Sequence, residues 1–402
     1  MLALRRAMEP LLLVALPVAW AVMTITTALD AGVDIGYDFR GTLWAPAWAV
    51  IHGGPIYAEP TTAAVTVGNP SVYPPLFILL ATPLTLLVET AAAWLWAGLL
   101  ALSVVAALLI VGLRDWRLHV VAVTSPVVVQ GLIFGNLTVA LMVPLALAWR
   151  YRNVAWVAGA AVAVAVAAKL VAWPLVFWLF FTRRFRAGSV SVALAIVFVV
   201  VPWALIGFEG FREYPELLRE VQAVYAKVSL SIASAAAGLG ASTTVAVTAS
   251  VLAGAALVAV AWWVSRGRDG DRRAYAAVVG ACILATPIVW PNYAALLFVP
   301  IAITWRRPAP AWFFGYAIWL AALLPRPSLA DVPCCKPPGM PETVWIHLHA
   351  DPAWEYPAAT MAVVAVVVAL LVVASRVTGA SPLGGQHHER GTLPNVGRRG
   401  PA

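Results

Sequence analysis

Charged residues are scarce in this sequence. Only 11% of its 402 residues are Asp, Glu, Lys or Arg, while 62% are hydrophobic. A soluble domain carries about a quarter charged residues, so the composition excludes an ordinary soluble protein and predicts a polytopic all-α membrane protein. The net charge of +8 does not indicate a nucleic-acid partner, because the basic residues stand in short clusters between apolar runs. Such clusters orient membrane helices instead.

Cysteine is also scarce, with three residues in the whole chain. Cys282 lies in an apolar run and is most simply a small core residue. Cys334 and Cys335 are adjacent, and adjacent thiols are difficult to bridge without strain. No spacing typical of metal ligands occurs, so we predict neither a metal site nor a cofactor. Lysine is rare beside arginine and Ala and Val are abundant, which indicates a bacterial gene rich in G and C.

The membrane topology follows from the apolar runs and the basic clusters. Residues 10–29 are long enough to span a bilayer and too long for a typical signal-peptide core, which predicts an uncleaved first helix. With both termini in the cytoplasm, nineteen of the 26 basic residues are cytoplasmic and 13 of the 18 acidic residues are external. Residues 30–74, 207–233 and 325–356 are then long external loops. The cytoplasmic clusters are Arg114/Arg117, Arg150/Arg152, Arg183/Arg184/Arg186, Arg266 to Arg273, Arg306/Arg307 and Arg376.

This topology predicts about 12 crossings. Residues 119–149 form a hairpin with Gly135 and Asn136 at its outer tip, and residues 154–182 form another with Lys169 near its tip. Residues 75–88 form a shallow or re-entrant helix and residues 91–113 a crossing, because this segment must cross an odd number of times. The polar, Gly-rich and basic residues 376–402 predict a disordered cytoplasmic tail.

The first external loop concentrates the acidic residues. Asp30, Asp34 and Asp38, followed by Arg40, come directly after the first helix. A solvated loop is the plain interpretation, and the Trp residues that follow suit an interfacial belt. Three carboxylates at the mouth of a helix bundle also favour a site where one of them acts as a tuned base. Further along, Tyr73 precedes two prolines that suit the start of a helix.

Lys169 is the second candidate for chemistry. It lies in an apolar stretch of almost 30 residues that is flanked by arginines. A buried charge in a membrane helix is costly and suggests function. Two interpretations stay open here: the side chain snorkels to the membrane surface, or it meets an anion such as a phosphate near the outer leaflet.

Five segments in a fixed order resemble a known family. They read YDFRGTLWAPAWAVIHGGPIY, VYPPLFILLATPL, FGNLTVALMVPLALAW, AGAAVAVAVAAKLVAWPLVFWLF and ATPIVWPNYAALLFVP. Over roughly residues 30–305 they resemble the polyprenyl-phosphate-mannose-dependent mannosyltransferases of glycosyltransferase family 87, which have a GT-C fold. The family's G-Q-x-N position reads here Gly135 to Thr138, and Asn292 and Tyr293 stand where the family often has histidines.

The resemblance implies an inverting transfer of mannose from polyprenyl-phosphate-mannose to a glycolipid or lipoglycan acceptor. The catalytic domain is then residues 1–375, in a bacterial plasma membrane, with the site on the external face. Matching the motifs makes Asp38 the general base and Lys169, with Arg40 second, the partner of the phosphate. The other residues that the resemblance places in substrate binding are Tyr57, Tyr73, Asn136 and Asn292.

Two other classes of protein stay open. Another GT-C enzyme with a lipid donor, such as an arabinofuranosyltransferase, would share the Asp after the first helix. A lipid flippase or solute transporter should show internal repeats and polar residues near the middle of the membrane. Neither is evident in the sequence, and the acidic residues gather at the outer face, which disfavours transport.

Overall fold

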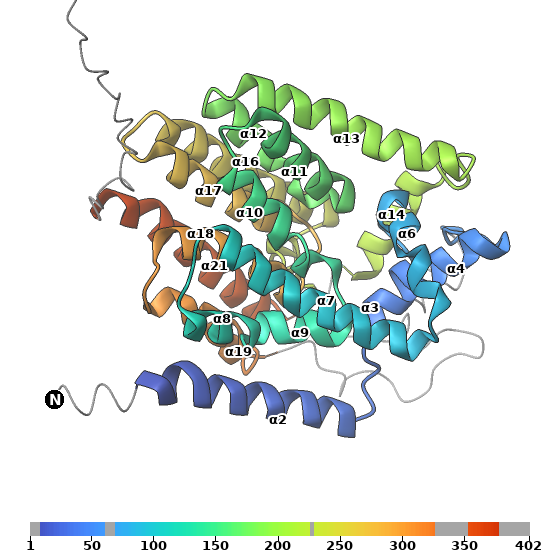
Figure 1. Ribbon diagram of the computed structural model, residues 1–402, viewed down its shortest axis with the longest axis horizontal. Helices are drawn as coiled ribbons and strands as arrows, with labels where there is room; N and C mark the ends of the chain where they lie inside the picture. The colour runs from blue at the N-terminus through green and yellow to red at the C-terminus, as the bar shows by residue number, and fades with distance from the viewer. Residues whose placement is uncertain (1–8, 61–68, 226–228, 326–352, 378–402) are drawn as a thin grey trace, which may run out of the picture.

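The structure is a bundle of helices (Figure 1). This computed structural model describes residues 9–60, 69–225, 229–325 and 353–377, and within these ranges it contains helices and helical turns but no strand. The predicted tail, most of the loop 325–356, and Cys334 with Cys335 lie outside the described residues. The last helix, α21 (Glu355–Val377), runs one residue past Arg376, where the tail was predicted to begin.

Five helices are long and apolar enough to cross a membrane. Two consecutive helices, α8 (Trp116–Val123) and α9 (Pro126–Phe134), would add a sixth span if they are taken together despite a bend of 58°. Between 17% and 39% of each long apolar stretch is buried, so their outer faces are apolar and exposed, as lipid-facing helices require. The five spans are Leu11–Asp30, Glu89–Ile110, Phe185–Leu205, Thr243–Ser265 and Glu355–Ala374.

The described part of the bundle also contains five shorter apolar helices. The remaining crossings would have to come from these helices, and the count of about twelve stays a prediction. These shorter helices are Pro75–Leu86, Leu137–Arg150, Ala155–Ala168, Leu170–Phe181 and Pro291–Thr304.

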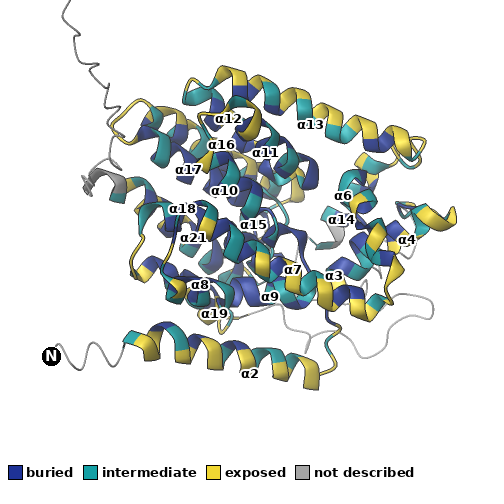
Figure 2. Ribbon diagram, viewed as in Figure 1, coloured by how far each residue is buried: buried dark blue, intermediate teal, exposed yellow. Residues whose placement is uncertain are grey.

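The core lies around α17 (Gly270–Leu284), which is buried along nearly its whole length and packs on α16 (Thr243–Ser265) and α21. Figure 2 shows this buried centre, with α2 (Leu16–Asp30) and α13 (Phe185–Leu205) exposed at the periphery. Helix α11 (Ala155–Ala168) is rich in Ala and Val and packs closely on α13. A Cβ at its Gly159 would lie 2.8 Å from the carbonyl oxygen of Ala187, so the small residue permits this approach.

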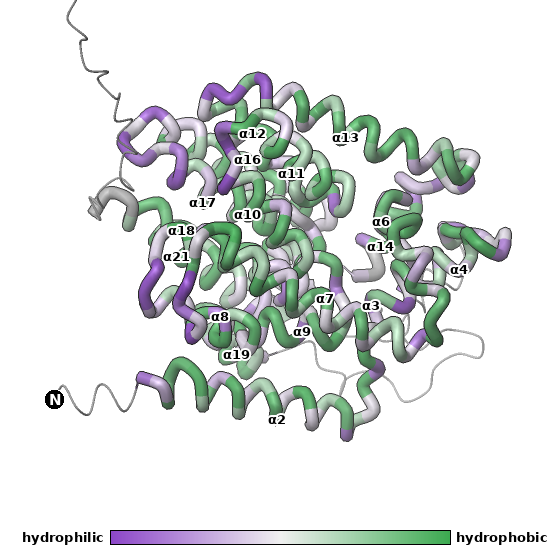
Figure 3. The backbone as a smooth tube through the Cα atoms, in the orientation of Figure 1, coloured by the Kyte–Doolittle hydropathy of each residue, from purple (hydrophilic) through white to green (hydrophobic). Residues whose placement is uncertain are grey.

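Some of the basic clusters predicted to share one face contact neighbouring connections of the bundle. Asp271 forms ion pairs with Arg152 and Arg184, each at 2.8 Å. These ion pairs hold together three connections between helices that are far apart in the sequence. Arg306 likewise donates to the carbonyl oxygens of Val111 and Gly112. Figure 3 shows hydrophilic connections at the ends of the apolar helices. The side of the membrane on which they lie stays a prediction.

The predicted external loop 30–74 contains more helix than expected. After α2, a turn leads into α3 (Tyr37–Phe39), a helical turn over Arg40–Trp44 and α4 (Ala45–His52). Residues 43–51 are mostly apolar, and one face of this segment packs on the bundle, with Leu43 and Ala47 buried, while Trp48 and Ile51 are exposed. The segment then reaches α6 (Pro75–Ala81) and the turn Thr82–Leu86, which together form the short helix expected before α7 (Glu89–Ile110).

Candidate functional site

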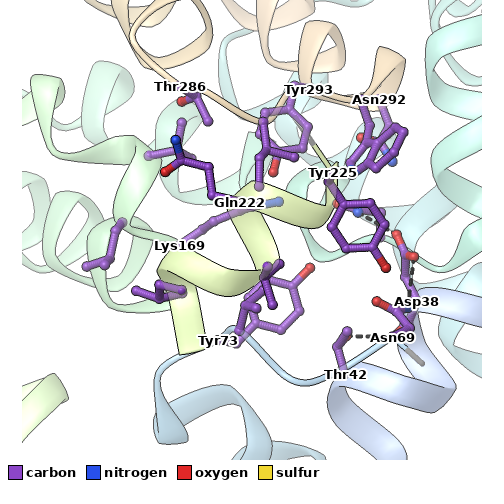
Figure 4. A pocket seen from close by; sticks show the side chains of 18 of the residues that line it. Asp38, Thr42, Asn69, Tyr73, Lys169, Gln222, Tyr225, Thr286, Asn292 and Tyr293 are labelled. Carbon is purple, nitrogen blue, oxygen red and sulfur yellow. Dashed lines mark hydrogen bonds between the residues drawn. The ribbon is translucent and has the colours of Figure 1, made fainter. Parts of the chain in front are cut away.

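A cavity of about 630 Å³ lies where these segments meet. Its lining comes from α3, the residues before α6, the turn after α9, the residues that follow the end of α11, α14 (Tyr214–Tyr225) and the segment 285–293. Figure 4 shows Asp38 and Lys169 reaching toward it from opposite sides. Among the described residues of its lining, Asp38 is the one carboxylate and Lys169 the one cation.

Asp38 is held in place by its backbone and by two amides. Gly36 precedes α3 with a φ of 77°, and its N–H donates to the carbonyl oxygen of Ile133 at 2.7 Å. The carboxylate of Asp38 accepts hydrogen bonds from Nδ2 of Asn136 at 2.6 Å and from Nδ2 of Asn69 at 3.2 Å. Each amide bonds a different carboxylate oxygen, so lone pairs remain on both oxygens for a substrate hydroxyl.

The charge of Asp38 is disfavoured by its surroundings. Burial raises the pKa of this carboxyl above its ordinary value of 3.8, although the two amide hydrogen bonds and the charge of Lys169 act in the opposite direction. A raised pKa makes a carboxylate a stronger base than a solvated one. The other two aspartates of the segment lie outside the cavity, and the Asp34 side chain is 74% exposed.

The turn after α9 connects Asp38 to Lys169. Asn136 donates to Asp38, while its Oδ1 accepts the backbone N–H of Thr138 at 3.0 Å. The Thr138 hydroxyl in turn accepts a hydrogen bond from Nζ of Lys169 at 2.8 Å. One turn, the predicted hairpin tip, therefore fixes both charged groups. It is buried in the bundle rather than exposed at an outer surface.

Lys169 lies where the second predicted hairpin changes direction. Helix α11 ends at Ala168, Lys169 takes an extended conformation with φ −155°, and α12 (Pro174–Phe181) follows after a helical turn. Its ammonium lies 3.9 Å from the ring centroid of Tyr293 and 5.6 Å from that of Tyr73. Aromatic faces stabilise a cation without neutralising it. The ammonium therefore remains able to attract an anion in the cavity.

The structure brings most of the predicted residues together. Tyr73, Asn136 and Asn292 line the cavity with Asp38 and Lys169.

Arg40 and Tyr57 do not reach the lining. The guanidinium of Arg40 lies 3.8 Å from Asp34 and 3.9 Å from Glu89, away from the cavity. Tyr57 donates its hydroxyl to the carbonyl oxygen of Tyr73 at 2.9 Å and so supports the lining from outside.

Sequence reasoning missed several polar residues of the lining, among them Asn69, Gln130, Gln222 and Tyr225. Asn69 stands in a polar loop, and nothing near it in the sequence indicates a contact with Asp38. Helix α14 could have been recognised as amphipathic, since Leu217 and Val221 are buried while its charged residues are exposed. The sequence around α14 does not indicate which part of the bundle this helix packs against.

Gly135 gives a first prediction about this geometry. Its φ is 72°, and an added Cβ would lie 2.8 Å from Cβ of Phe39 and 3.1 Å from Cα of Gly36. Gly135→Ala should therefore push α3 away from the turn and weaken the bond between Asn136 and Asp38. We expect the activity of the site to fall at least about tenfold and the melting temperature to drop, from strain and overpacking of about 1–3 kcal/mol.

Gly32→Ala is the matched control. Gly32 has a similar φ of 73°, but an added Cβ would meet nothing within 4 Å. It therefore carries the same backbone strain without the collision. Equal losses of activity in the two variants would contradict the positioning role of Gly135.

The site presents a carboxylate, a cation and hydrogen-bonding amides around one cavity. Among the residues that the structure describes, no group of three or more His, Cys, Asp or Glu could hold a metal ion. The arrangement can take a proton from a hydroxyl at Asp38 while it holds an anionic group at Lys169. This is the chemistry of group transfer from a phosphate to an alcohol.

Comparison with known proteins gives one match. No curated protein and no solved structure matches the chain. The model of glycosyltransferase family 87 matches residues 72–291, more than half of the sequence. The matched part includes Tyr73, Asn136 and Lys169, while Asp38 and Asn69 precede it. The chain therefore belongs to glycosyltransferase family 87.

Proposed function

We propose that this glycosyltransferase moves mannose from a polyprenyl-phosphate donor to a hydroxyl group of a glycolipid or lipoglycan on the external face of a bacterial plasma membrane. The observation that carries the proposal is that Asp38 and Lys169 line the same cavity. They are the one carboxylate and the one cation among the described residues of its lining. They reach toward it from opposite sides (Figure 4). Family membership favours this function over transport.

The mechanism is a single displacement. Asp38 takes the proton of the acceptor hydroxyl while that oxygen attacks the anomeric carbon of the donor sugar. The bond from the anomeric carbon to the phosphate oxygen breaks on the opposite face, so the configuration inverts. Lys169 stabilises the charge on the departing polyprenyl phosphate. Phosphate leaves readily without protonation, which agrees with a cavity that offers one carboxylate rather than two.

The wall of the cavity near Lys169 suits a lipid. Leu170, Val171 and Trp173 follow Lys169 in the sequence, and Leu218 and Val221 of α14 complete an apolar stretch of the lining. Leu170 and Trp173 are also exposed at the bundle surface. A polyprenyl chain can therefore lie against apolar side chains while its phosphate meets the ammonium.

A donor panel tests this function. Membranes containing the protein are incubated with glycolipid acceptors and one labelled donor at a time: polyprenyl-phosphate-mannose, polyprenyl-phosphate-arabinofuranose or a nucleotide-linked mannose. We expect label in the acceptor with the mannosyl lipid only. Transfer from the arabinofuranosyl lipid would replace the proposed sugar, and transfer from the nucleotide sugar alone would overturn the proposal.

The pH dependence of kcat/KM gives a second prediction. A general base works when it is ionised, so the rate falls as pH drops through its pKa. Because burial raises the pKa of Asp38 above 3.8, the acid limb should lie above the range of an ordinary aspartate. Asp34→Asn should leave the profile unchanged, since Asp34 lies outside the cavity. Activity that stays level down to about pH 4 would contradict the assignment.

A further inference from the structure

Two amide oxygens in the cavity wall have no hydrogen-bond donor among the described residues. They are Oδ1 of Asn292 and Oε1 of Gln130, and both atoms are buried. Asn292 is only 2% exposed, and both side chains line the cavity. A buried polar atom without a partner costs about 1–3 kcal/mol and is rare in folded proteins. Such atoms at a cavity indicate that a ligand supplies the donors.

The two amides come from elements that pack against each other. Gln130 is on α9, and Asn292 is in the helical turn Pro291–Leu297, which contacts α9. A Cβ added at Gly131, next to Gln130, would lie 3.2 Å from Cβ of Asn292. Helix α9 and this turn therefore approach each other closely, and each contributes one of the two amides to the lining.

This wall lies between the base and the cation. Helix α9 leads directly into the turn whose Asn136 bonds Asp38. Asn292 is followed by Tyr293, whose ring lies against the ammonium of Lys169. Figure 4 shows Asn292 and Tyr293 together at the edge of the cavity. A sugar whose anomeric carbon lies between Asp38 and Lys169 would present its other carbons to this wall.

We propose that Asn292 and Gln130 form a subsite that binds the hydroxyl groups of the transferred sugar. This inference rests on the proposed function and adds the residues that recognise the sugar. An amide carries both donor and acceptor atoms, and so does a hydroxyl group, so the two match without any net charge. Sites built to hydrogen-bond a hydroxyl reject analogues that lack it, because the protein's own polar atoms then stay unpaired.

The test compares the binding of two lipids that differ only by the sugar. Affinities for polyprenyl phosphate and for polyprenyl-phosphate-mannose are measured in nanodiscs by competition with labelled polyprenyl phosphate. The variants Asn292→Leu and Gln130→Met remove the amides at similar volume. We expect each to lose about fivefold of the preference for the mannosyl lipid and to keep the affinity for polyprenyl phosphate.

Ser125→Ala is the matched control. Ser125 precedes α9, and its buried hydroxyl also lacks a partner among the described residues, but it does not line the cavity. This variant should keep the full preference for the mannosyl lipid. If it loses as much as the two amide variants, those losses reflect a general disturbance of α9 and the subsite is wrong.

The outcomes separate the subsite from the proposed function. If the wild-type protein transfers mannose but both amide variants keep the wild-type preference, the subsite is wrong and the function stands. Equal wild-type affinity for the two lipids, with transfer intact, also overturns the subsite alone. A wild-type protein that binds neither lipid contradicts the proposed function, and the subsite falls with it.

Discussion

Asp38→Asn should abolish transfer while the protein stays folded and still binds its donor. Loss of a general base typically costs about 10²- to 10⁴-fold in rate. The amide keeps the size of the carboxyl but offers one acceptor oxygen to two donors, Asn136 and Asn69. Asn136 cannot easily rotate to adapt, because its Oδ1 holds the backbone N–H of Thr138. A small fall in melting temperature should therefore accompany the loss of turnover.

Asp30→Asn and Asp34→Asn are the matched controls for this experiment. Both residues share the segment and charge of Asp38, but neither lines the cavity. All three variants are compared at saturating donor and acceptor, with melting temperature and donor affinity measured in parallel. If Asp38→Asn keeps more than a tenth of wild-type turnover while Asp34→Asn is inactive, Asp34 is the base. If all three remain active, this segment performs no acid–base chemistry and the proposed mannosyltransferase mechanism fails.

Lys169→Met should weaken the use of the phospholipid donor. Met keeps the length and apolar stem of the side chain but removes the charge that faces the phosphate. A charge contact of this kind in a poorly hydrated site is worth about 2–4 kcal/mol. We therefore expect kcat/KM for the donor to fall about 30- to 1000-fold, together with a lower affinity for polyprenyl phosphate.

Thr138→Val separates the charge of Lys169 from its position. The variant removes the hydroxyl that accepts from Nζ of Lys169 but leaves the ammonium beside Tyr293. Its loss of donor affinity should be smaller than that of Lys169→Met. Normal activity and donor affinity in Lys169→Met would mean that the lysine has no part in anion binding and only fills the wall.

The sequence-predicted residues that the structure places at the cavity stand at positions marked by local signals. A glycine that must take a positive φ ends α9 at Gly135, and a polar residue interrupts an apolar helical run at Lys169. Both positions were predicted as hairpin tips, and Lys169 and Asn136, which follows Gly135, line the cavity. The bridge from Asn136 through Thr138 to Lys169 was not predicted, because it depends on how two segments far apart in the sequence meet in the fold.

The choice among the three aspartates also depends on tertiary structure. Asp30, Asp34 and Asp38 are evenly spaced, and only matching to the family pattern favoured Asp38. In the structure, α2 ends at Asp30 and the chain turns at Gly32 and Gly36, which are both at positive φ. The second turn aims Asp38 inward and leaves Asp34 at the surface. Asn69 completes the base from a distant loop, and no periodicity in the sequence marks it.

The extent of the membrane-spanning part was predicted less well. Hydropathy identifies apolar runs, but it does not distinguish a lipid-facing span from a short helix buried in the bundle. Helix α17 is an example of a short buried helix: it has 15 residues, and nearly all of them are buried. Loop 325–356 and the tail 376–402 fall largely outside the described residues and remain predictions.

The anomeric configuration of the product tests the central claim most directly. The purified protein is given polyprenyl β-mannosyl phosphate, ¹³C-labelled at the anomeric carbon, with a glycolipid acceptor, and the one-bond C–H coupling of the new linkage is measured by NMR. One carboxylate acting as a base predicts an α-mannoside formed by inversion. A β-mannoside would contradict the account, because retention requires a covalent intermediate on the residue that we assign as the base.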